Sequence, residues 1–443
     1  MKYIILILLI WMVSFAHSNA QWQRLLSERT FSITANPLNP KTIYVGGKGR
    51  VLYRSYNAGK TWDTVVINFR DDRAIITNIY INSIDTTIMM IGGINLTTII
   101  RSADGGKTWE NSPEFGFPLT LSGESMIEDV NNPSVIYFAQ LRGGIIYKSI
   151  DTGKTWKILT KSLPVNDVCS LVMLPNSNTI IGGADNGFLV KSIDGGSTWD
   201  LYRVVPFNSG GPEIPKIVFS TRNKLLGYAV VTYFYQDKVD NGGLYRTTNG
   251  GETWENIYLR DTSLWTIAIR RVGNEDELFV GGYTDDSTPI RTVPGNSVVR
   301  HSQNSGSTWD VMDNAVDWVD TIRRNVWMMK FVNTSPVYDR LYMATESGFF
   351  VFEMPVSVDE HEVQPSSDGI QISPNPVSTS LTVSGLDGVS EVKVVNSLGM
   401  EVLSQQVISH TSEFDVSGLA SGMYVVQFRT PTGTTSKLII VNH

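Results

Sequence analysis

The stretch SADGGKTW, from Ser102 to Trp109, decides the fold because it recurs with small changes along most of the chain. Six copies fit the pattern Ser/Thr-x-Asp/Asn-x-Gly-x-Thr-Trp, and each copy is called a box below. The boxes are SYNAGKTW ending at Trp62, SADGGKTW at Trp109, SIDTGKTW at Trp156, SIDGGSTW at Trp199, TTNGGETW at Trp254 and SQNSGSTW at Trp309. The fold must therefore be built from repeated units.

Each box predicts a tight turn between two strands. Its Asp or Asn can accept hydrogen bonds from backbone N–H groups, its glycine supplies a positive φ, and its hydroxyl groups can satisfy further backbone groups. The tryptophan is large enough to wedge between neighbouring units. The Asp or Asn positions are Asn57, Asp104, Asp151, Asp194, Asn249 and Asn304. We interpret the boxes as structural, because one protein does not need six copies of one active site.

The boxes belong to a longer repeat. Successive box tryptophans lie about 40 to 55 residues apart, the period of propeller blades. Before each box comes an apolar strand such as 75–81, a polar turn such as 131–133, a second strand that often ends in Gly-Gly, and a third strand. A fourth strand begins at the box tryptophan. The repeat therefore predicts one antiparallel blade of four strands.

The blade count follows from the two ends of this region. After Trp309 the pattern predicts strands at 326–332, 340–344 and 349–353, but no box follows them. The segment that begins at Trp22 resembles the sequence after a box tryptophan. We expect this segment to supply the missing fourth strand, which would close the ring and hide its edges. The sequence thus predicts an all-β fold with a seven-bladed β-propeller over 21–355.

The boxes resemble the Asp-box, or bacterial neuraminidase, repeat. Proteins with this repeat include sialidases, sortilin-type receptor domains, xyloglucan-cleaving glycosidases and a photosystem II assembly factor. The resemblance implies a β-propeller whose boxes lie opposite the usual ligand face. It leaves the chemistry open, because a fold does not confer a function.

The beginning of the chain is typical of a secretory signal. Lys2 precedes the apolar run 3–15, which is short for a membrane span, and Ser18-Asn19-Ala20 fits a cleavage site. We expect residues 1–20 to be removed and the mature chain to contain no transmembrane segment. An uncleaved anchor is the alternative. Near the other end, the polar and acidic residues 356–369 are typical of a linker.

Residues 370–443 alternate short apolar strands with Gly, Asn and Ser turns, which predicts a small Ig-like β-sandwich. The segment contains SPNP at 373–376, NSLG at 396–399, VSGLASGMY at 416–424 and a last strand at 437–441. In this order the motifs resemble the type A C-terminal sorting domain of the type IX secretion system of Bacteroidetes. The resemblance implies export through the periplasm, with the secretion machinery as partner, to the outer-membrane surface or the medium.

Composition excludes several classes of function. A net charge of −7 argues against nucleic acid as a partner. The single cysteine, Cys169, lies in an apolar run, so no intrachain disulfide is possible and a buried core position is favoured. The five histidines form no pair at ligand spacing, so we expect neither a metal nor a cofactor. We expect a monomer.

Ligand binding is expected on the loops that join strand four to strand one and strand two to strand three. Aromatic side chains there can stack on sugars or peptide side chains, and arginines can bind acidic groups. The predicted binding residues are Arg70, Arg73, Arg142, Trp265, Tyr283, Trp318 and Trp327. For any one of these aromatics, a place in the core is the competing interpretation.

Glycoside hydrolysis is the alternative function, because two carboxylates about 5 to 10 Å apart suffice for it. The candidate carboxylates are Asp71, Asp72, Asp237, Asp285 and Asp286. Sialidase activity is disfavoured, because the Arg-Ile-Pro motif of sialidases is absent. The most similar segment is Glu213-Ile214-Pro215, which has an acidic residue in place of the arginine. Xyloglucan-cleaving relatives typically use two propellers, whereas one is predicted here. Non-catalytic binding of a glycan or a surface protein is therefore the favoured interpretation.

Overall fold

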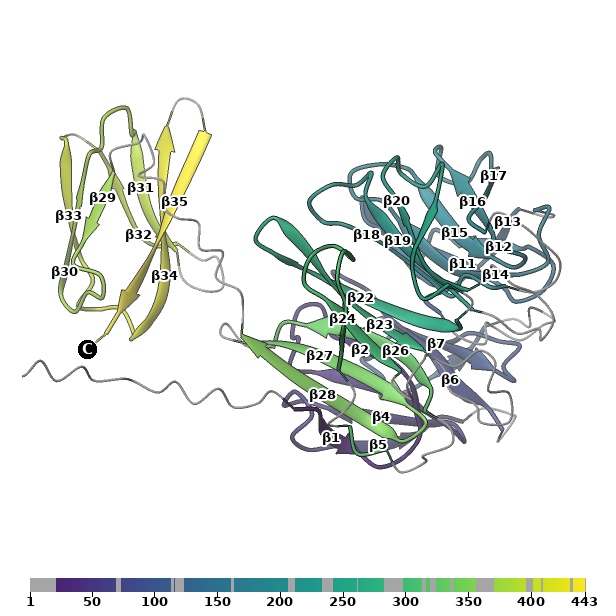
Figure 1. The fold of residues 1–443 in the computed structure, drawn as a ribbon. Coiled ribbons are helices and arrows are strands. Elements are labelled where there is room, and N and C mark those ends of the chain that lie inside the picture. Colours follow the sequence, from purple (N-terminus) through teal and green to yellow (C-terminus); the bar gives the residue numbers. More distant parts are fainter. Residues whose placement is uncertain are drawn as a thin grey trace, which may run out of the picture. The chain divides into compact units, whose positions relative to one another are not determined.

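The chain folds into two compact units, Met1–Ser357 and Val358–His443, each described here by itself (Figure 1). The computed structural model describes residues 21–68, 73–112, 115, 123–160, 163–205, 212–232, 242–260, 262–282, 298–312, 316–318, 324–334, 338–355, 370–395, 401–407, 409–430 and 433–442. Its named elements are all strands. Across these ranges, no helix is long and apolar enough to span a membrane. The predicted signal peptide at 1–20 and linker at 356–369 lie outside the described residues.

The first unit contains seven four-stranded antiparallel sheets among its described residues, and six of them use four consecutive strands. Their first strands are β2 (Thr30–Ala35), β6 (Ile75–Ile81), β10 (Met126–Asp129), β14 (Val168–Met173), β18 (Lys216–Phe219) and β22 (Leu264–Val272). Their second strands are β3 (Ile43–Gly47), β7 (Met89–Ile94), β11 (Asn132–Ala139), β15 (Ile180–Ala184), β19 (Gly227–Val231) and β23 (Glu275–Gly282).

The outer strands of these six sheets flank the boxes. The third strands are β4 (Val51–Ser55), β8 (Ile100–Ser102), β12 (Ile146–Ser149), β16 (Phe188–Ser192), β20 (Gly243–Thr247) and β24 (Val299–Ser302). The fourth strands are β5 (Asp63–Val66), β9 (Glu110–Asn111), β13 (Lys157–Thr160), β17 (Asp200–Arg203), β21 (Glu255–Tyr258) and β25 (Asp310–Val311). Every box therefore forms the turn between a third and a fourth strand.

The remaining sheet joins both ends of the unit. Its strands are β26 (Val326–Val332), β27 (Tyr338–Thr345), β28 (Gly348–Pro355) and β1 (Gln23–Leu26). Strand β1 pairs antiparallel with β28, and Gln23 lies opposite Val351. The N-terminal strand thus occupies the fourth position of the last sheet, where the sequence placed it.

The sheets are arranged around an axis. Their first strands are neighbours in the cyclic order β2, β6, β10, β14, β18, β22, β26 and back to β2. Apolar clusters fill the spaces between successive sheets, and a box tryptophan packs against six of these clusters. Trp109, for example, packs against the cluster that contains Tyr44 and Leu52 of the preceding sheet. Burial between sheets therefore stabilises the arrangement.

Trp22 takes the place of a box tryptophan between the last two sheets. It is buried in the cluster that joins them. Its ring centroid lies 5.3 Å from that of Phe352, and its Nε1–H donates to the carbonyl oxygen of Met312 at 2.8 Å. The closing sheet thus reproduces the packing of the boxes without a box sequence.

The hydrogen bonds within a box explain its sequence. In the second box the Asp104 carboxylate accepts from the Thr108 N–H at 2.9 Å and from the Thr108 hydroxyl at 2.6 Å. The Ser102 Oγ accepts from the N–H of Gly106, whose φ of 82° favours glycine. Equivalent bonds recur in the other five boxes. The residue types of the pattern are those that this turn requires.

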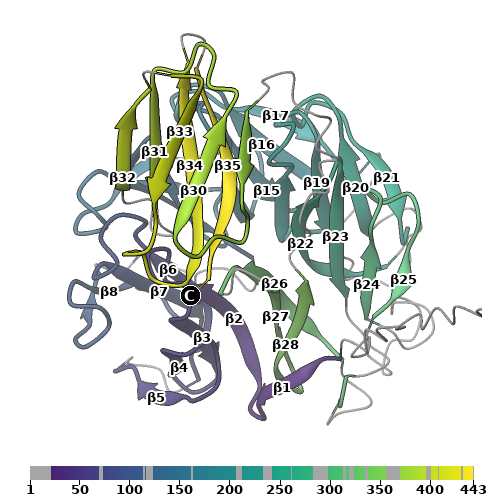
Figure 2. The same ribbon diagram turned by 90° about the vertical axis from the view of Figure 1, so that its left-hand side faces the viewer.

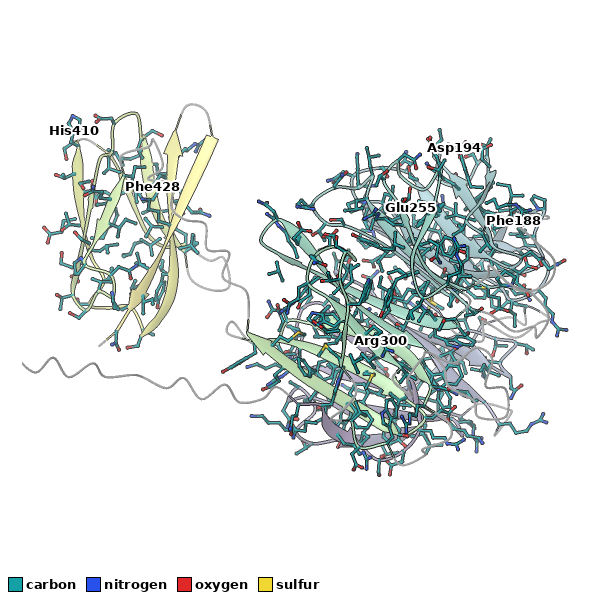
Figure 3. All side chains as sticks on the ribbon, in the orientation of Figure 1. Phe188, Asp194, Glu255, Arg300, His410 and Phe428 are labelled. Atoms are coloured by element: carbon teal, nitrogen blue, oxygen red, sulfur yellow. The ribbon has the colours of Figure 1, made fainter. Side chains whose placement is uncertain are left out.

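Antiparallel pairing assigns the connections to two faces. The boxes share one face with the turns between first and second strands, and we call it the box face. A backbone bond from Gly195 N–H to the carbonyl of Asn178, at 3.0 Å, joins the two kinds of turn. The loops from strand four to strand one and from strand two to strand three lie on the opposite face, which we call the loop face. Asp194 in the turn between β16 and β17 marks the box face in Figure 3.

The second unit contains two sheets (Figure 2). One has the order β29 (Gln371–Ser373), β30 (Ser380–Ser384), β33 (Thr411–Asp415), and the other β32 (Glu401–Gln406), β31 (Glu391–Val395), β34 (Gly422–Thr430), β35 (Gly433–Val441). Side chains of both sheets form one apolar core, which includes Leu381, Val392 and Phe428. Phe428 is labelled within this unit in Figure 3. Alternating burial along β33 reflects the period-two pattern of the sequence.

Candidate functional site

The predicted binding residues that the structure describes lie in loop-face segments. Arg73 precedes β6, Arg142 lies between β11 and β12, and Trp318 lies between β25 and β26. Trp265 and Trp327 are the second residues of β22 and β26. Seven other candidates lie outside the described residues: Arg70, Asp71, Asp72, Asp237, Tyr283, Asp285 and Asp286.

The structure brings two of the predicted tryptophans together. The rings of Trp265 and Trp327 meet edge to face with centroids 5.2 Å apart, and Phe31 lies 5.8 Å from Trp327. Trp265 is only 5% exposed, so it packs in the core, whereas Trp327 is half-buried. Trp318 instead packs against Phe350, with centroids 6.2 Å apart. Trp327 is therefore the better placed of the contacting pair to meet a ligand.

A group of carboxyl groups lies on the loop face at the fourth and fifth sheets. Asp167 immediately precedes β14, Asp185 follows β15, and Glu213 precedes β18. Asp185 is buried and accepts from the Asn166 N–H at 3.0 Å and from the Asn186 side-chain amide at 2.7 Å. We call Asp167, Asp185 and Glu213 the carboxylate cluster.

Arg142 joins the carboxylate cluster to the third sheet. Its backbone N–H donates to Asp167 Oδ1 at 2.6 Å, and its side chain is exposed. The backbone there has a φ of 69°, a left-handed conformation that is uncommon for residues other than glycine. The loop is therefore held in a defined position that presents a guanidinium group beside a carboxylate.

The environment of the carboxylate cluster raises the proton affinity of two of its members, Glu213 and Asp167. Burial, followed by repulsion from Asp167 and Asp185, raises the pKa of Glu213 to about 7. Burial also raises the pKa of Asp167, against the lowering effect of the Arg142 N–H. A carboxyl group that titrates near neutral pH beside other carboxylates has the properties of a general acid. The carboxylate cluster also joins three loops, because Asp167 accepts from the Arg142 N–H and Asp185 accepts from the Asn166 N–H. It therefore has a structural role as well.

Sequence reasoning found only part of this cluster. Arg142 was predicted as a binding residue. Asp185 was recognisable from its position between a second and a third strand. Glu213 was noted only because Glu213-Ile214-Pro215 is the segment most similar to the absent Arg-Ile-Pro motif of sialidases. Asp167 was missed, although its position directly before a first strand was a usable signal.

The loop face carries charge of two signs. Basic side chains lie around the last, first and second sheets: Arg29, Lys48, Arg50, Arg73 and Arg324. Glu346 accompanies them and forms an ion pair with Arg29, with 3.2 Å between Oε2 and Nε. The carboxylate cluster supplies negative charge at the fourth and fifth sheets. A ligand with both hydroxyl and acidic groups would find partners on this face.

Two further observations concern metal ligands and the cysteine in the part of the chain that the structure describes. Within it, no three His, Cys, Asp or Glu side chains are placed to hold a metal ion. Cys169 is buried, and burial raises the pKa of its thiol well above the ordinary value, which disfavours a reactive thiolate.

Two curated proteins share sequence with this chain. A xyloglucanase of Paenibacillus sp. is 25% identical over 36% of this chain and 13% of its own length. The xyloglucanase Xgh74A of Acetivibrio thermocellus is 24% identical over 51% of this chain and 25% of its own length. The chain thus matches a quarter or less of each of these relatives.

Solved structures support the fold at low sequence identity. A GH74 enzyme of Niastella koreensis has a TM-score of 0.56 and 15% identity, over 95% of this chain and 74% of its own. YCF48 of Cyanidioschyzon merolae has a TM-score of 0.52 and 15% identity, over 75% of this chain and 98% of its own. With the four-stranded antiparallel sheets, these similarities support a β-propeller.

A family model identifies the second unit. Residues 371–442 match the secretion system C-terminal sorting domain, which confirms the resemblance seen in its motifs. This match covers β29 to β35. The chain is therefore a secreted protein with a β-propeller fold, and its C-terminal unit is a sorting domain of the type IX secretion system.

Proposed function

We propose that this protein is a seven-bladed Asp-box propeller that binds a glycan on its loop face. The seven sheets, the cyclic order of their first strands and the pairing of β1 with β28 support the blade count. The repeated hydrogen bonds of the boxes support the Asp-box assignment. The C-terminal unit is in this proposal an Ig-like sandwich that engages the secretion machinery and brings a monomeric propeller to the outer-membrane surface or the medium.

One observation carries the binding proposal: Arg142 and the carboxylate cluster lie together on the face opposite the boxes. Carboxylates accept hydrogen bonds from sugar hydroxyl groups, and an exposed guanidinium group donates to sugar oxygens. Trp327, half-buried on the same face, offers an aromatic surface for stacking. Because both curated relatives are named xyloglucanases, a glycan of the xyloglucan class is the first candidate.

Binding is tested with the purified full chain on a glycan array, followed by titration calorimetry with xyloglucan oligosaccharides. Arg142→Asn removes the guanidinium group while Asn tolerates the left-handed backbone at this position. We expect this variant to bind at least about tenfold more weakly. Arg222→Asn, in the exposed turn between β18 and β19 on the box face, is the matched control and should bind normally.

Two results would contradict the glycan proposal. If the unmodified chain binds no glycan at millimolar concentration, the loop face has another ligand, and a surface protein becomes the candidate. If Arg142→Asn and Arg222→Asn bind equally well, the glycan site lies elsewhere on the molecule.

Hydrolysis of a glycan is the second candidate function, favoured by the raised pKa of Glu213. A protonated Glu213 would act as general acid, and Asp167 or Asp185 would act as base or nucleophile. The release of reducing ends from xyloglucan is the measurement. Glu213→Gln should abolish it and leave binding within a few-fold, because the amide keeps its hydrogen-bonding capacity. Binding without release of reducing ends would leave the non-catalytic proposal standing.

A further inference from the structure

The axis of the propeller contains a cavity of ≈ 310 Å³ that the proposed glycan site does not use. Residues of six first strands line it, from β2, β6, β10, β14, β18 and β26. The lining is mixed: Ile79, Met126, Leu171, Met173 and Met328 contribute apolar surface, and polar and charged residues contribute the rest. Its volume is at the lower end of the range of ligand pockets, roughly 300 to 1,000 Å³.

One end of the cavity lies at a group of three charged side chains from three sheets, of which Glu124 and Lys330 line the cavity and Lys216 lies behind them. The carboxylate of Glu124 lies 3.3 Å from the Lys330 ammonium group and 3.9 Å from that of Lys216. The Lys216 side chain is only 9% exposed, and its Nζ also donates to the carbonyl of Met329 at 3.2 Å. Two ammonium groups facing one carboxylate give this lysine end a net charge of +1. It attracts a carboxylate.

The other end of the cavity is acidic. Glu128, four residues along the same chain segment from Glu124, also lines the cavity. It accepts hydrogen bonds from the Tyr80 hydroxyl at 2.8 Å and from the Ser83 N–H at 3.1 Å, which are neutral donors that leave its charge unbalanced. Val130, which is 48% exposed in the turn after β10, places this acidic end toward the box face.

The separation of the charged ends limits the ligand. Four residues of extended strand span roughly 13 Å. Lys330 and Glu128 both line the cavity, and the length of their side chains shortens the distance that remains to be bridged. An extended tripeptide spans about 10 Å, carries a carboxylate at one end and an ammonium group at the other, and can present apolar side chains to the wall.

We propose that this axial cavity binds a short peptide with free termini, its carboxylate at Lys330 and its ammonium group at Glu128. Capture of a terminal charge is an established mode of peptide recognition. The residues that line the cavity are not those of the carboxylate cluster or Arg142, so the inference stands independently of the glycan site on the loop face.

The test uses the full chain and three forms of one peptide, Ala-Leu-Ala: free at both termini, N-acetylated and C-amidated. Titration calorimetry should show that each blocked form binds about tenfold more weakly than the free peptide, because each loses a charged hydrogen bond. Equal affinity for all three forms, or no binding of the free peptide at its solubility limit, would overturn the proposal.

Variants then assign each terminus. Lys330→Met should remove the preference for the free over the amidated peptide, and Glu128→Gln the preference for the free over the acetylated peptide. Lys107→Met, at an exposed box position, is the control and should change neither ratio. Because ratios within one variant are compared, a general loss of stability cannot imitate these results. Unchanged ratios in the two cavity variants would contradict the assignment.

Methyl spectra of 13C-labelled methionines locate the bound peptide. Met126, Met173 and Met328 line the cavity, whereas Met343 is buried in the cluster between the last two sheets. Free Ala-Leu-Ala should shift the first three signals and leave that of Met343 in place. Shifts confined to other methionines would place the peptide outside the axial cavity and refute the proposal.

Discussion

The two faces of the propeller use carboxylates in opposite ways. On the box face, the Thr198 N–H, followed by the Thr198 and Ser192 hydroxyls, lowers the pKa of Asp194 to about 2. On the loop face, burial and neighbouring carboxylates raise the pKa of Glu213 to about 7. The turn around Asp194 supplies hydrogen-bond donors to its carboxylate. The fold instead places Glu213 close to the carboxylates of Asp167 and Asp185. The box face is thus built for stability, and the loop face holds a group whose charge changes near neutral pH.

The largest expected effect concerns the packing that the boxes provide. Trp22→Ala removes the buried ring that replaces a box tryptophan in the closing sheet, so it should lower the free energy of unfolding by about 3–5 kcal/mol. Urea denaturation measures this change. Trp22→Phe keeps most of the apolar surface but loses the bond to Met312, so it should cost less. A loss below about 1 kcal/mol for Trp22→Ala would show that the closing strand is dispensable.

An intermediate effect is expected at Glu213. Its folded pKa lies above the ordinary value of 4.5, so the folded state binds this proton more tightly. The resulting stability is present below pH 4.5 and is lost as pH rises to about 7. Glu213→Gln should therefore be more stable than the unmodified chain at pH 8, by about 1–3 kcal/mol, and similar to it at pH 4. Thermal unfolding across this range is the measurement, and a constant difference would contradict the raised pKa.

The smallest effect, with the opposite sign, is expected at Asp194. Its folded pKa is depressed, so its contribution to stability is present above the ordinary value of 3.8 and is lost as pH falls to about 2. Asp194→Asn reproduces the residue found at Asn57, whose Oδ1 accepts from the Thr61 N–H at 2.9 Å. This variant should match the unmodified chain at pH 2 and be slightly less stable at pH 6. If it lost stability in parallel with the unmodified chain on acidification, the box would not be the source of the dependence.

The sequence predicted the repeated parts of the molecule well, because each box turn is determined within eight residues. Asp104 finds its partners at Thr108 and Ser102, and such local pairs are visible in a single sequence. Even the placement of Trp22 was predictable, because the segment after it resembles the segments after the boxes. The sorting domain was recognisable for a similar reason, since its motifs follow one another in order.

Individual residues of the loop face, such as Arg142, could be predicted, but the contacts that form the sites on the axis and the loop face could not, because the partners are distant in sequence. Glu124 meets Lys330 from a position 206 residues earlier. Nothing near either residue indicates the other, since each occupies a first strand or the loop before it. Asp167, Asp185 and Glu213 likewise come from three separate loops. Such groups form only when successive sheets are placed around the axis, so their chemistry is a property of the ring.

The pairing of β1 with β28 also sets the order in which the molecule can be completed. Gln23 is made near the start of the chain, but its partner Val351 follows only after the other six sheets. The ring must therefore stay open while these sheets form, with one strand edge unpaired at each end. Joining residues so far apart carries a large loop-closure cost, and such non-local pairings form slowly. If the chain crosses a membrane with its N-terminus first, the propeller cannot close until the last sheet has emerged. The part of the chain still to cross would then remain open and able to pass through the membrane.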